Sequence, residues 1–338
     1  MSPVELKFLP QNLVQQVVCG AAHTLLLSAS GRLFSCGLGV QGQLGRGYQE
    51  SQCEFHPIEG VNGIVSASAG FCHSAAVTRK GEVYVWGSNK ENQLGIFKHD
   101  DKDGSAYPLS ITALHGSKAI QVECGAYHNI VLTAEKEVFT WGKGAHGRLG
   151  HGSEDNEVLP RRVESLRKLN IVSVAAGYDH SAALSADGRL WMWGHGEWYQ
   201  LGTGNKKNQL EPTLIEIDTN VKQVSCGGFH SAAVGYNGTL FTWGVGMYGA
   251  LGHGNDTPSV VTEPCVVDMP ASVQQVACGW KHCVAVTRMG DVFAWGHGAE
   301  GQLGMGNDHD LWAPARVPLL IGKSVRSVSA GLNHSSAF

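Results

Sequence analysis

Charged residues are scarce in this 338-residue chain, at 16% of the total, and they do not gather by sign. The 25 basic and 29 acidic residues leave a net charge of −4, and neither end carries a run of Lys or Arg. Proteins that bind nucleic acid directly carry a clustered basic stripe. We therefore expect no direct contact with nucleic acid.

Long apolar runs are also missing. No stretch approaches the ~20 apolar residues that a membrane-spanning helix needs. The segment 1–18 has no basic start followed by an apolar run, so it does not predict a signal peptide. We expect no membrane span, and a cytoplasmic or nuclear location.

The cysteines do not follow a metal-binding or redox spacing. None of the nine forms a C-x-x-C pair, and their number is odd. We interpret them as small packing residues of a protein in a reducing compartment, and we expect no metal site. They are Cys19, Cys36, Cys53, Cys72, Cys124, Cys226, Cys265, Cys278 and Cys283.

Catalytic motifs are absent too. The chain has no phosphate-binding P-loop, no G-x-S-x-G and no H-E-x-x-H. Short Gly-x-Gly strings such as 244–246 follow expected strands, but no helix is expected after them, so they are not dinucleotide fingerprints. We predict that the protein is not an enzyme, has no catalytic residues and needs no cofactor.

What the chain does contain is glycine, 45 residues of it, arranged in a repeat. Seven copies of the motif G-x-x-H recur at spacings of 50 to 55 residues, a period typical of repeat architectures. Its histidines are His23, His73, His128, His180, His230, His282 and His334.

Other residues recur at fixed offsets from this histidine. A Gly follows eight residues later in five units, and a Trp-Gly pair thirteen residues later in five. A Leu-Gly pair follows twenty-one residues later in six, and all length variation falls between that pair and the next histidine. A proline opens each unit: Pro3, Pro57, Pro108, Pro160, Pro212, Pro264 and Pro314.

The sixth unit illustrates the predicted local structure. Segments 276–278, 283–287 and 292–295 are rich in strand-forming residues, and the turn at 288–291 contains Gly290, which tolerates a positive φ. Segment 264–267 is expected to be a short outer strand, where proline is tolerated. Four short antiparallel strands per unit make one blade of a β-propeller.

We therefore predict an all-β fold, a seven-bladed β-propeller of four-stranded antiparallel blades. The whole chain, 1–338, is expected to be a single propeller domain. Its repeat units span 3–56, 57–107, 108–159, 160–211, 212–263 and 264–313, with a partial unit at 314–338.

The repeat resembles the regulator-of-chromosome-condensation family, whose founder is the exchange factor of the GTPase Ran. The resemblance rests on Cys-Gly-Trp-Lys-His at 278–282, Val-Phe-Ala-Trp-Gly at 292–296 and Gly-Gln-Leu-Gly at 301–304, with their counterparts in the other units. It runs from Pro3 to Phe338 and implies a seven-bladed propeller. The family includes exchange factors, a plant ultraviolet-B photoreceptor, and interaction domains of ubiquitin ligases and ciliary proteins, so it does not fix a function.

The seventh unit departs from the pattern. It stops four residues after His334, before the position of its Trp-Gly strand. Either the chain is a fragment of a longer protein, which we favour, or the last blade is one strand short. A blade left open exposes strand edges that invite pairing with another chain.

The histidines are expected to be structural. Seven at one repeat position indicate that each bonds backbone across a turn and locks its own blade. The histidines near the Trp-Gly strands are expected to be solvated loop residues without the further ligands that zinc needs. They are His146, His151, His195, His253 and His297.

The two variable positions within G-x-x-H are expected to crowd one face near the axis, because all seven lie in equivalent turns. Five of the turns carry an aromatic residue, which is typical of a protein-binding surface, although packing between blades is an equal alternative. The predicted partner-binding face comprises Phe71, Tyr127, Tyr178, Asp179, Phe229, Trp280 and Lys281. A second candidate loop contains Trp198 and Tyr199.

The resemblance bears on these turns. In the photoreceptor, tryptophans at this turn form the light-sensing cluster, and only Trp280 matches them here. In the Ran exchange factor, acidic and histidine side chains at these turns meet the GTPase, and here Asp179 alone is acidic.

Two functions remain open. The favoured one is a protein-interaction propeller, a regulatory or scaffolding module from a longer protein. The alternative is a guanine-nucleotide exchange factor that stabilises a nucleotide-free small GTPase. The expected partner is a protein, either a small GTPase or a component of the ubiquitin pathway.

Overall fold

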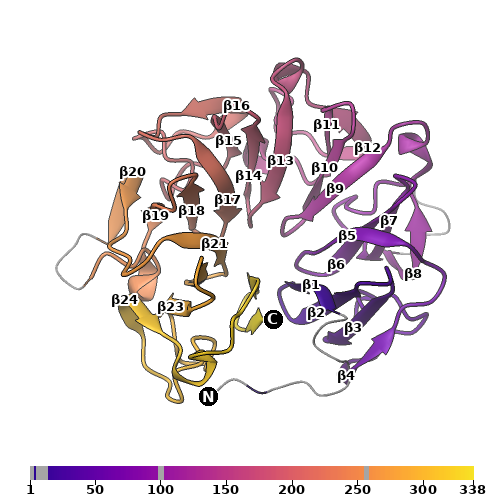
Figure 1. Ribbon diagram of the computed structural model, residues 1–338. Coiled ribbons are helices and arrows are strands. Elements are labelled where there is room, and N and C mark those ends of the chain that lie inside the picture. The colour runs from indigo at the N-terminus through magenta and orange to yellow at the C-terminus, as the bar shows by residue number, and fades with distance from the viewer. Residues whose placement is uncertain (1–3, 5–13, 98–102, 255–258) are drawn as a thin grey trace.

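The computed structural model describes residue 4 and residues 14–97, 103–254 and 259–338. In this part of the chain, six four-stranded antiparallel sheets and one two-stranded sheet stand around a central axis (Figure 1). The prediction of seven four-stranded blades is therefore wrong. Among the described residues, the seventh sheet contains only β25 (Val328–Ala330) and β26 (Ser335–Ala337).

Each four-stranded sheet runs from the axis outward in sequence order. The innermost strands are β1 (Val14–Cys19), β5 (Ile64–Ala69), β9 (Ala119–Cys124), β13 (Ile171–Ala176), β17 (Val221–Cys226) and β21 (Val273–Cys278). The second strands are β2 (His23–Ser28), β6 (His73–Thr78), β10 (His128–Thr133), β14 (His180–Ser185), β18 (His230–Gly235) and β22 (His282–Thr287).

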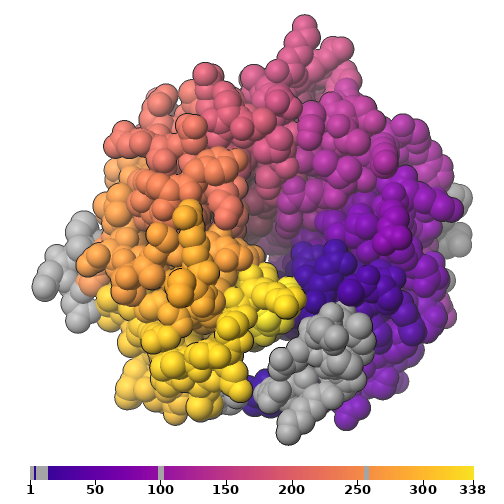
Figure 2. All heavy atoms as spheres, in the orientation of Figure 1, coloured from indigo at the N-terminus to yellow at the C-terminus, as the bar shows by residue number. Residues whose placement is uncertain are grey.

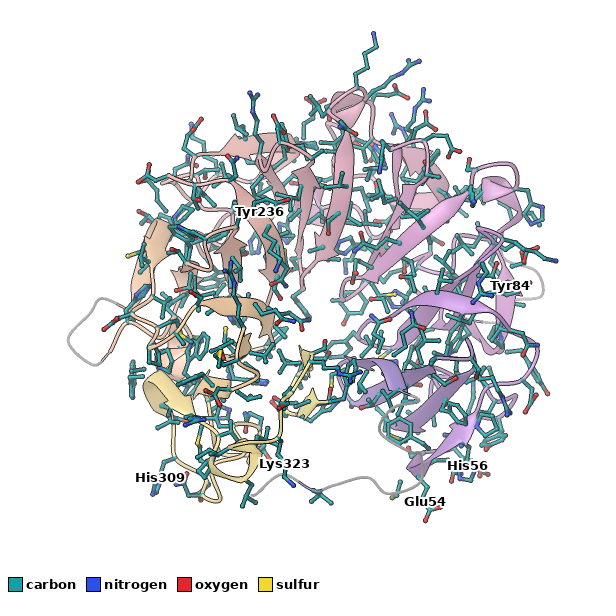
Figure 3. All side chains as sticks on the ribbon, in the orientation of Figure 1. Glu54, His56, Tyr84, Tyr236, His309 and Lys323 are labelled. Carbon is teal, nitrogen blue, oxygen red and sulfur yellow. The ribbon has the colours of Figure 1, made fainter. Side chains whose placement is uncertain are left out.

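The outer half of each sheet follows the same order. The third strands are β3 (Leu33–Gly37), β7 (Val83–Ser88), β11 (Val138–Gly142), β15 (Leu190–Gly194), β19 (Leu240–Val245) and β23 (Val292–Gly296). The outermost are β4 (Gln52–Pro57), β8 (Gly104–Ser110), β12 (Glu157–Arg162), β16 (Gln209–Ile215), β20 (Val260–Val266) and β24 (Leu311–Arg316). Glu54 and His56 on β4 lie at the rim of the ring (Figure 3).

Short 3-10 turns complete the secondary structure. They are η2 (Thr112–Leu114), η3 (Ala145–Gly147), η4 (Glu164–Leu166), η5 (Met247–Gly249) and η6 (Pro318–Leu320). No helix in the described ranges is long and apolar enough to span a membrane.

The proline-led strands are outermost, as expected, but each pairs with the sheet that precedes it. Pro57 lies opposite Phe34 of β3, and β20, which contains Pro264, pairs with β19 rather than with β23. The first of the repeated prolines, Pro3, lies outside the described residues. A repeat gives the number of residues per unit, but it does not show at which residue one sheet ends and the next begins. The sequence alone therefore did not assign the outer strands to their sheets.

The core lies between neighbouring sheets. All residues of the six complete second strands are buried, and the five tryptophans of the Trp-Gly strands are fully buried. One cluster joins Ala232 and Val234 of β18 to Val276, Ala285 and Trp295 of the next sheet. No single sheet could bury both faces, so the ring is needed to form the core.

The repeated histidine joins neighbouring sheets. Its Nε2 lies 2.8–3.1 Å from a side-chain atom of the residue that directly follows the histidine of the next unit. The expectation that it bonds backbone within its own blade is therefore wrong. The partners around the ring are Ser74, Asn129, Ser181, Ser231, Cys283, Ser335 and, from His334, Thr24.

The hydrogen bonds from His180 through Ser231 to the Gln200 carbonyl form a chain, here called a relay, in which the donor of each bond can be assigned. Ser231 Oγ donates to the carbonyl of Gln200 at 2.8 Å, and Trp243 Nε1 donates to the same carbonyl at 2.9 Å. A hydroxyl has one proton, so His180 Nε2 must be the donor to Ser231. Burial lowers the pKa of His180 to about 3, which keeps the ring neutral.

The inner strands are clamped by side chains. Gln223 donates from Nε2 to the carbonyl of Val276 at 2.8 Å and accepts its N–H at 3.0 Å. Gln275 makes the same pair of bonds to Val328 at 3.2 Å. Side chains thus satisfy backbone groups that would otherwise line the axis unpaired.

The two-stranded sheet closes the ring. The Cys19 N–H donates to Ser329 Oγ at 3.0 Å, and Thr24 Oγ1 lies 3.0 Å from His334 Nε2. In the space-filling view the C-terminal segment (yellow) contacts the first sheet (indigo) (Figure 2). The first and last sheets of the ring therefore lie side by side.

Candidate functional site

The predicted partner-binding face is formed by the turns between first and second strands. At four junctions the turn glycine accepts, through its carbonyl, an N–H from the turn of the preceding unit, as Gly227 does from Tyr178 at 3.1 Å. A Cβ on Gly227 would lie 2.7 Å from the Gly279 carbonyl oxygen, so only glycine fits there. The two variable residues of each turn are thereby held at equivalent places around the axis.

Aromatic side chains from five of these turns form a continuous surface. Trp280 packs edge-on against Phe229 with ring centroids 5.0 Å apart, and against Tyr178 at 4.4 Å. Tyr178 in turn lies 6.1 Å from both Phe71 and Tyr127, which are 5.8 Å apart. All five side chains are half-buried, so each packs on its neighbours and keeps an accessible edge.

The second candidate loop joins this surface through one residue. Trp198 follows β15, is 39% exposed, and packs on Phe229 at 5.7 Å. Tyr199 adopts a left-handed backbone conformation (φ 56°), and its ring lies under Lys206 Nζ at 5.5 Å. We use the name aromatic face for Phe71, Tyr127, Tyr178, Trp198, Phe229 and Trp280.

Charged residues border the aromatic face. Arg148, almost fully buried, pairs with Asp179 at 2.5 Å, and Lys143 pairs with Glu91 at 3.1 Å. Lys143 Nζ also lies 5.2 Å from the centre of the Tyr127 ring. Burial raises the pKa of Tyr127 to about 12, and nearby Tyr178 adds to the effect, so the phenol stays protonated.

A second layer borders this surface, and sequence reasoning did not single out three of its members, Glu91, Lys143 and Tyr248. Lys281 Nζ lies 4.8 Å from the Tyr248 ring, which is tilted against His297 at 4.5 Å. Lys143, His195 and His297 come two residues after the Trp, and Glu91, Tyr248 and Trp198 come three residues later still. The residues at these two offsets differ between units as much as the residues of the turns do. The sequence therefore contained the signal that could have identified this layer.

The loop histidines are half-buried and paired, so the expectation that they are solvated is wrong. His146 and His195 stack with centroids 4.1 Å apart, beside Asp179. His151 and His253 lie 2.9 and 3.0 Å from the hydroxyls of Thr140 and Thr242.

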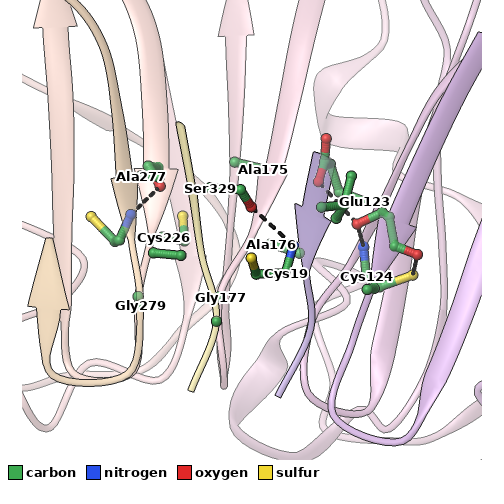
Figure 4. Close-up of a pocket in the computed structure, with 18 of the residues that line it drawn as sticks. Cys19, Glu123, Cys124, Ala175, Ala176, Gly177, Cys226, Ala277, Gly279 and Ser329 are labelled. Carbon is green, nitrogen blue, oxygen red and sulfur yellow. Dashed lines mark hydrogen bonds between the residues drawn. The ribbon is translucent and has the colours of Figure 1, made fainter. Parts of the chain in front are cut away.

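A channel of about 330 Å³ runs along the axis between the inner strands. Figure 4 shows Cys19, Cys124, Cys226 and Ser329 along its wall, together with Glu123. Burial raises the pKa of Glu123 to about 7, against hydrogen bonds from Gln121 at 3.0 Å and Ser68 at 3.2 Å. Thiols, amides and hydroxyls therefore line the axis together with Val and Ala, and Phe71, Tyr178 and Trp280 of the aromatic face also line the channel.

Solved structures of other proteins share this fold. Human WBSCR16 matches with a TM-score of 0.88 and 27% identity, over 97% of this chain and 87% of that one. Prp20p of Saccharomyces cerevisiae, described with its binding to Gsp1p and histones, matches with a TM-score of 0.88, 24% identity and 99% and 85% coverage. The likeness to Prp20p shows the fold alone.

Curated relatives are more similar in sequence. The ultraviolet-B receptor UVR8 of Arabidopsis thaliana is 34% identical over 94% of this chain and 61% of the receptor. The ubiquitin ligase HERC2 of Homo sapiens is 34% identical over 94% of this chain and 6% of the ligase. HERC6 of Homo sapiens, a probable ubiquitin ligase, is 37% identical over 96% of this chain and 27% of that protein.

This chain thus spans less than two thirds of the length of these relatives. The RCC1-like domain model matches residues 1–337, and the chain therefore belongs to the family of RCC1-like domains.

Proposed function

We propose that this propeller is a protein-binding module with a regulatory or scaffolding role, and that its partner docks on the aromatic face. The observation that carries the proposal is the unbroken contact of six aromatic rings, from Trp198 through Phe229 and Trp280 to Tyr178, Phe71 and Tyr127. Trp and Tyr dominate the residues that supply most binding energy at protein interfaces.

The surroundings of these rings support the same proposal. A protein interface places aromatic anchors at its centre and polar groups at its rim. Lys143, Lys281 and Glu91 lie around the rings. The rings hold one another in place, so little side-chain entropy remains to be lost on binding.

The relatives suggest where such a partner belongs. HERC2 and HERC6 carry ubiquitin-ligase names, and this chain covers only a small share of each. We infer that a ubiquitin-pathway substrate or regulator is one class of partner. A small GTPase is the alternative class, for which the domain would act as an exchange factor.

One observation weighs against the exchange-factor alternative. The exchange-factor alternative depends on Asp179, the one acidic residue of the turns, for contact with a GTPase. The Asp179 carboxylate already pairs with Arg148 at 2.5 Å, and the Arg148 side chain is 2% exposed. Releasing it would leave a nearly buried guanidinium without its counter-ion.

The test is quantitative binding to a partner identified by affinity capture from cell lysate. The Phe229→Ala/Trp280→Ala double variant should lose that partner. A double variant of exposed aromatics elsewhere, Tyr236→Ala/Trp312→Ala, should keep it, since these residues are 58% and 41% exposed and lie on a hairpin and on β24.

Circular dichroism and thermal unfolding establish that both variants are folded. A folded Phe229→Ala/Trp280→Ala variant that still binds would overturn the assignment of the face. Accelerated nucleotide release from a panel of small GTPases would instead establish the alternative.

A further inference from the structure

A pair of cysteines faces a histidine at the junction of the fifth and sixth sheets. Cys278 and Cys283 lie opposite each other on β21 and β22, and their sulfur atoms are 3.6 Å apart. His230 of β18 approaches from the neighbouring sheet, with Nε2 3.1 Å from Cys283 Sγ. All three residues are buried.

The spacing of these atoms suits a metal ion. The three ligand atoms lie within 4.8 Å of one another. A triangle with two sides of 3.1 and 3.6 Å and a third of at most 4.8 Å has a point between about 1.8 and 2.4 Å from all three corners. Zinc bonds to Cys sulfur and His nitrogen at about 2.3 and 2.0 Å.

We propose that His230, Cys278 and Cys283 form a binding site for a thiophilic d¹⁰ cation, Zn²⁺ or Cu⁺. Two thiolates and an imidazole are the soft donor set that both ions prefer. The site is distinct from the aromatic face and does not rest on the proposed function.

The repeat itself shows that this junction is unusual. In the other units the residue after the histidine is Thr24, Ser74, Asn129, Ser181, Ser231 or Ser335. The Cys278 position is also a cysteine at Cys19, Cys124 and Cys226, but none of these is followed by a second cysteine across its hairpin. One substitution, Ser to Cys at 283, thus completes a ligand set.

The site also has an entry path. Cys278 lines the axial channel, whose volume of about 330 Å³ accommodates a hydrated ion. Water from the channel can supply a further ligand on that side. The sequence offered no C-x-x-C motif because the two thiols come from facing strands and the imidazole from another sheet.

The experiment is a titration of the reduced 338-residue chain with Zn²⁺ against a chromophoric chelator, and separately with Cu⁺ against a Cu⁺-specific chelator under nitrogen. We expect one equivalent of at least one ion to bind. Binding of Co²⁺ should give the intense near-ultraviolet band of a thiolate-bound ion, which identifies sulfur ligands.

The repeat supplies variants that keep the fold. Cys283→Ser introduces the residue that the preceding unit has at the equivalent position, Ser231. Cys278→Ala introduces the alanine that two other units have at the equivalent positions, Ala69 and Ala176. Each should weaken binding by more than about a hundredfold, beyond what loss of a supporting contact costs. Cys124→Ala, at the equivalent place of the third sheet, should bind as wild type.

Three results would overturn the proposal. They are failure of the reduced wild-type chain to bind either ion, unchanged binding by the Cys278→Ala/Cys283→Ser variant, and a Co²⁺ complex without the thiolate band. The last two would move the site to nitrogen and oxygen donors such as His146, Asp179 and His195.

Discussion

Arg148 Nη1 lies 2.5 Å from Asp179 Oδ1, and this ion pair joins the loop after β11 to the turn before β14. Arg148 stands where four other units have a glutamine: Gln43, Gln93, Gln200 and Gln302. Those glutamines accept a backbone N–H of their own loop at 2.8–2.9 Å. The arginine instead reaches across the junction between sheets.

We predict that Asp179→Ala lowers the free energy of unfolding by about 3 kcal/mol, because it leaves a nearly buried charge without a partner. Adding Arg148→Gln should recover most of the loss, since glutamine is what the repeat uses there. Urea unfolding measures both effects. If the double variant is less stable than Asp179→Ala, the arginine has a further role that this pair does not explain.

A second prediction concerns the relay of His180, Ser231 and the Gln200 carbonyl. Ser231→Ala removes an acceptor and a donor inside the core and should cost about 1–3 kcal/mol. Ser231→Cys should cost less, because Cys283 fills the equivalent place. Equal stability of the alanine and wild-type proteins in chemical denaturation would contradict the relay.

Acidity should unfold this protein steeply. Burial lowers the pKa of His23, His180 and His282 to about 3 and that of His73 to about 4, from an ordinary value of 6.5. The unfolded chain therefore binds protons that the folded chain does not, so stability is full above pH 6.5 and falls as the pH is lowered toward 3. Each such histidine contributes a slope of about 1.4 kcal/mol per pH unit.

The measurement is the urea midpoint between pH 8 and pH 4. The pKa of His334 is the exception, because Cys19 raises it against the effect of burial. The stability that His334 contributes is therefore lost as the pH rises through its folded-state pKa. A His180→Gln variant should show a shallower pH slope than wild type. A midpoint that stays constant from pH 8 to pH 5 would contradict the neutral state of these rings.

The closing contact of the ring gives a fourth prediction. Ser329→Ala removes the acceptor of the buried Cys19 N–H and should lower the free energy of unfolding by about 1–3 kcal/mol. Ser327→Ala, which also changes a serine lining the channel, is the matched control. Thermal unfolding of the two variants side by side decides the matter, and equal melting temperatures would count against the contact.

The repeat predicted the strands well because offsets from the histidine are constant, and it placed Phe71, Tyr127, Tyr178, Phe229 and Trp280 on one surface for the same reason. It could not show that the histidine bonds the next sheet. A repeat shows which residues occupy equivalent positions in the units, but it does not show which residues of neighbouring sheets are in contact.

The remaining differences have related causes. The outer strands were assigned one sheet too late because a variable loop separates each from its sheet, as 38–51 separates β4 from β3. The pairing of Cys278 with Cys283 depends on hairpin register, which spacing along the chain does not express.

Ring closure has a kinetic consequence. The histidine contacts within the ring join residues 51 to 56 apart in sequence, whereas the bonds of Cys19 to Ser329 and of Thr24 to His334 each join residues 310 apart. Folding slows as the separation of contacting residues grows. The sheets should therefore assemble in chain order during synthesis, and an open arc, in which the Cys19 N–H of β1 still lacks its acceptor Ser329, should persist until Ser329 leaves the ribosome.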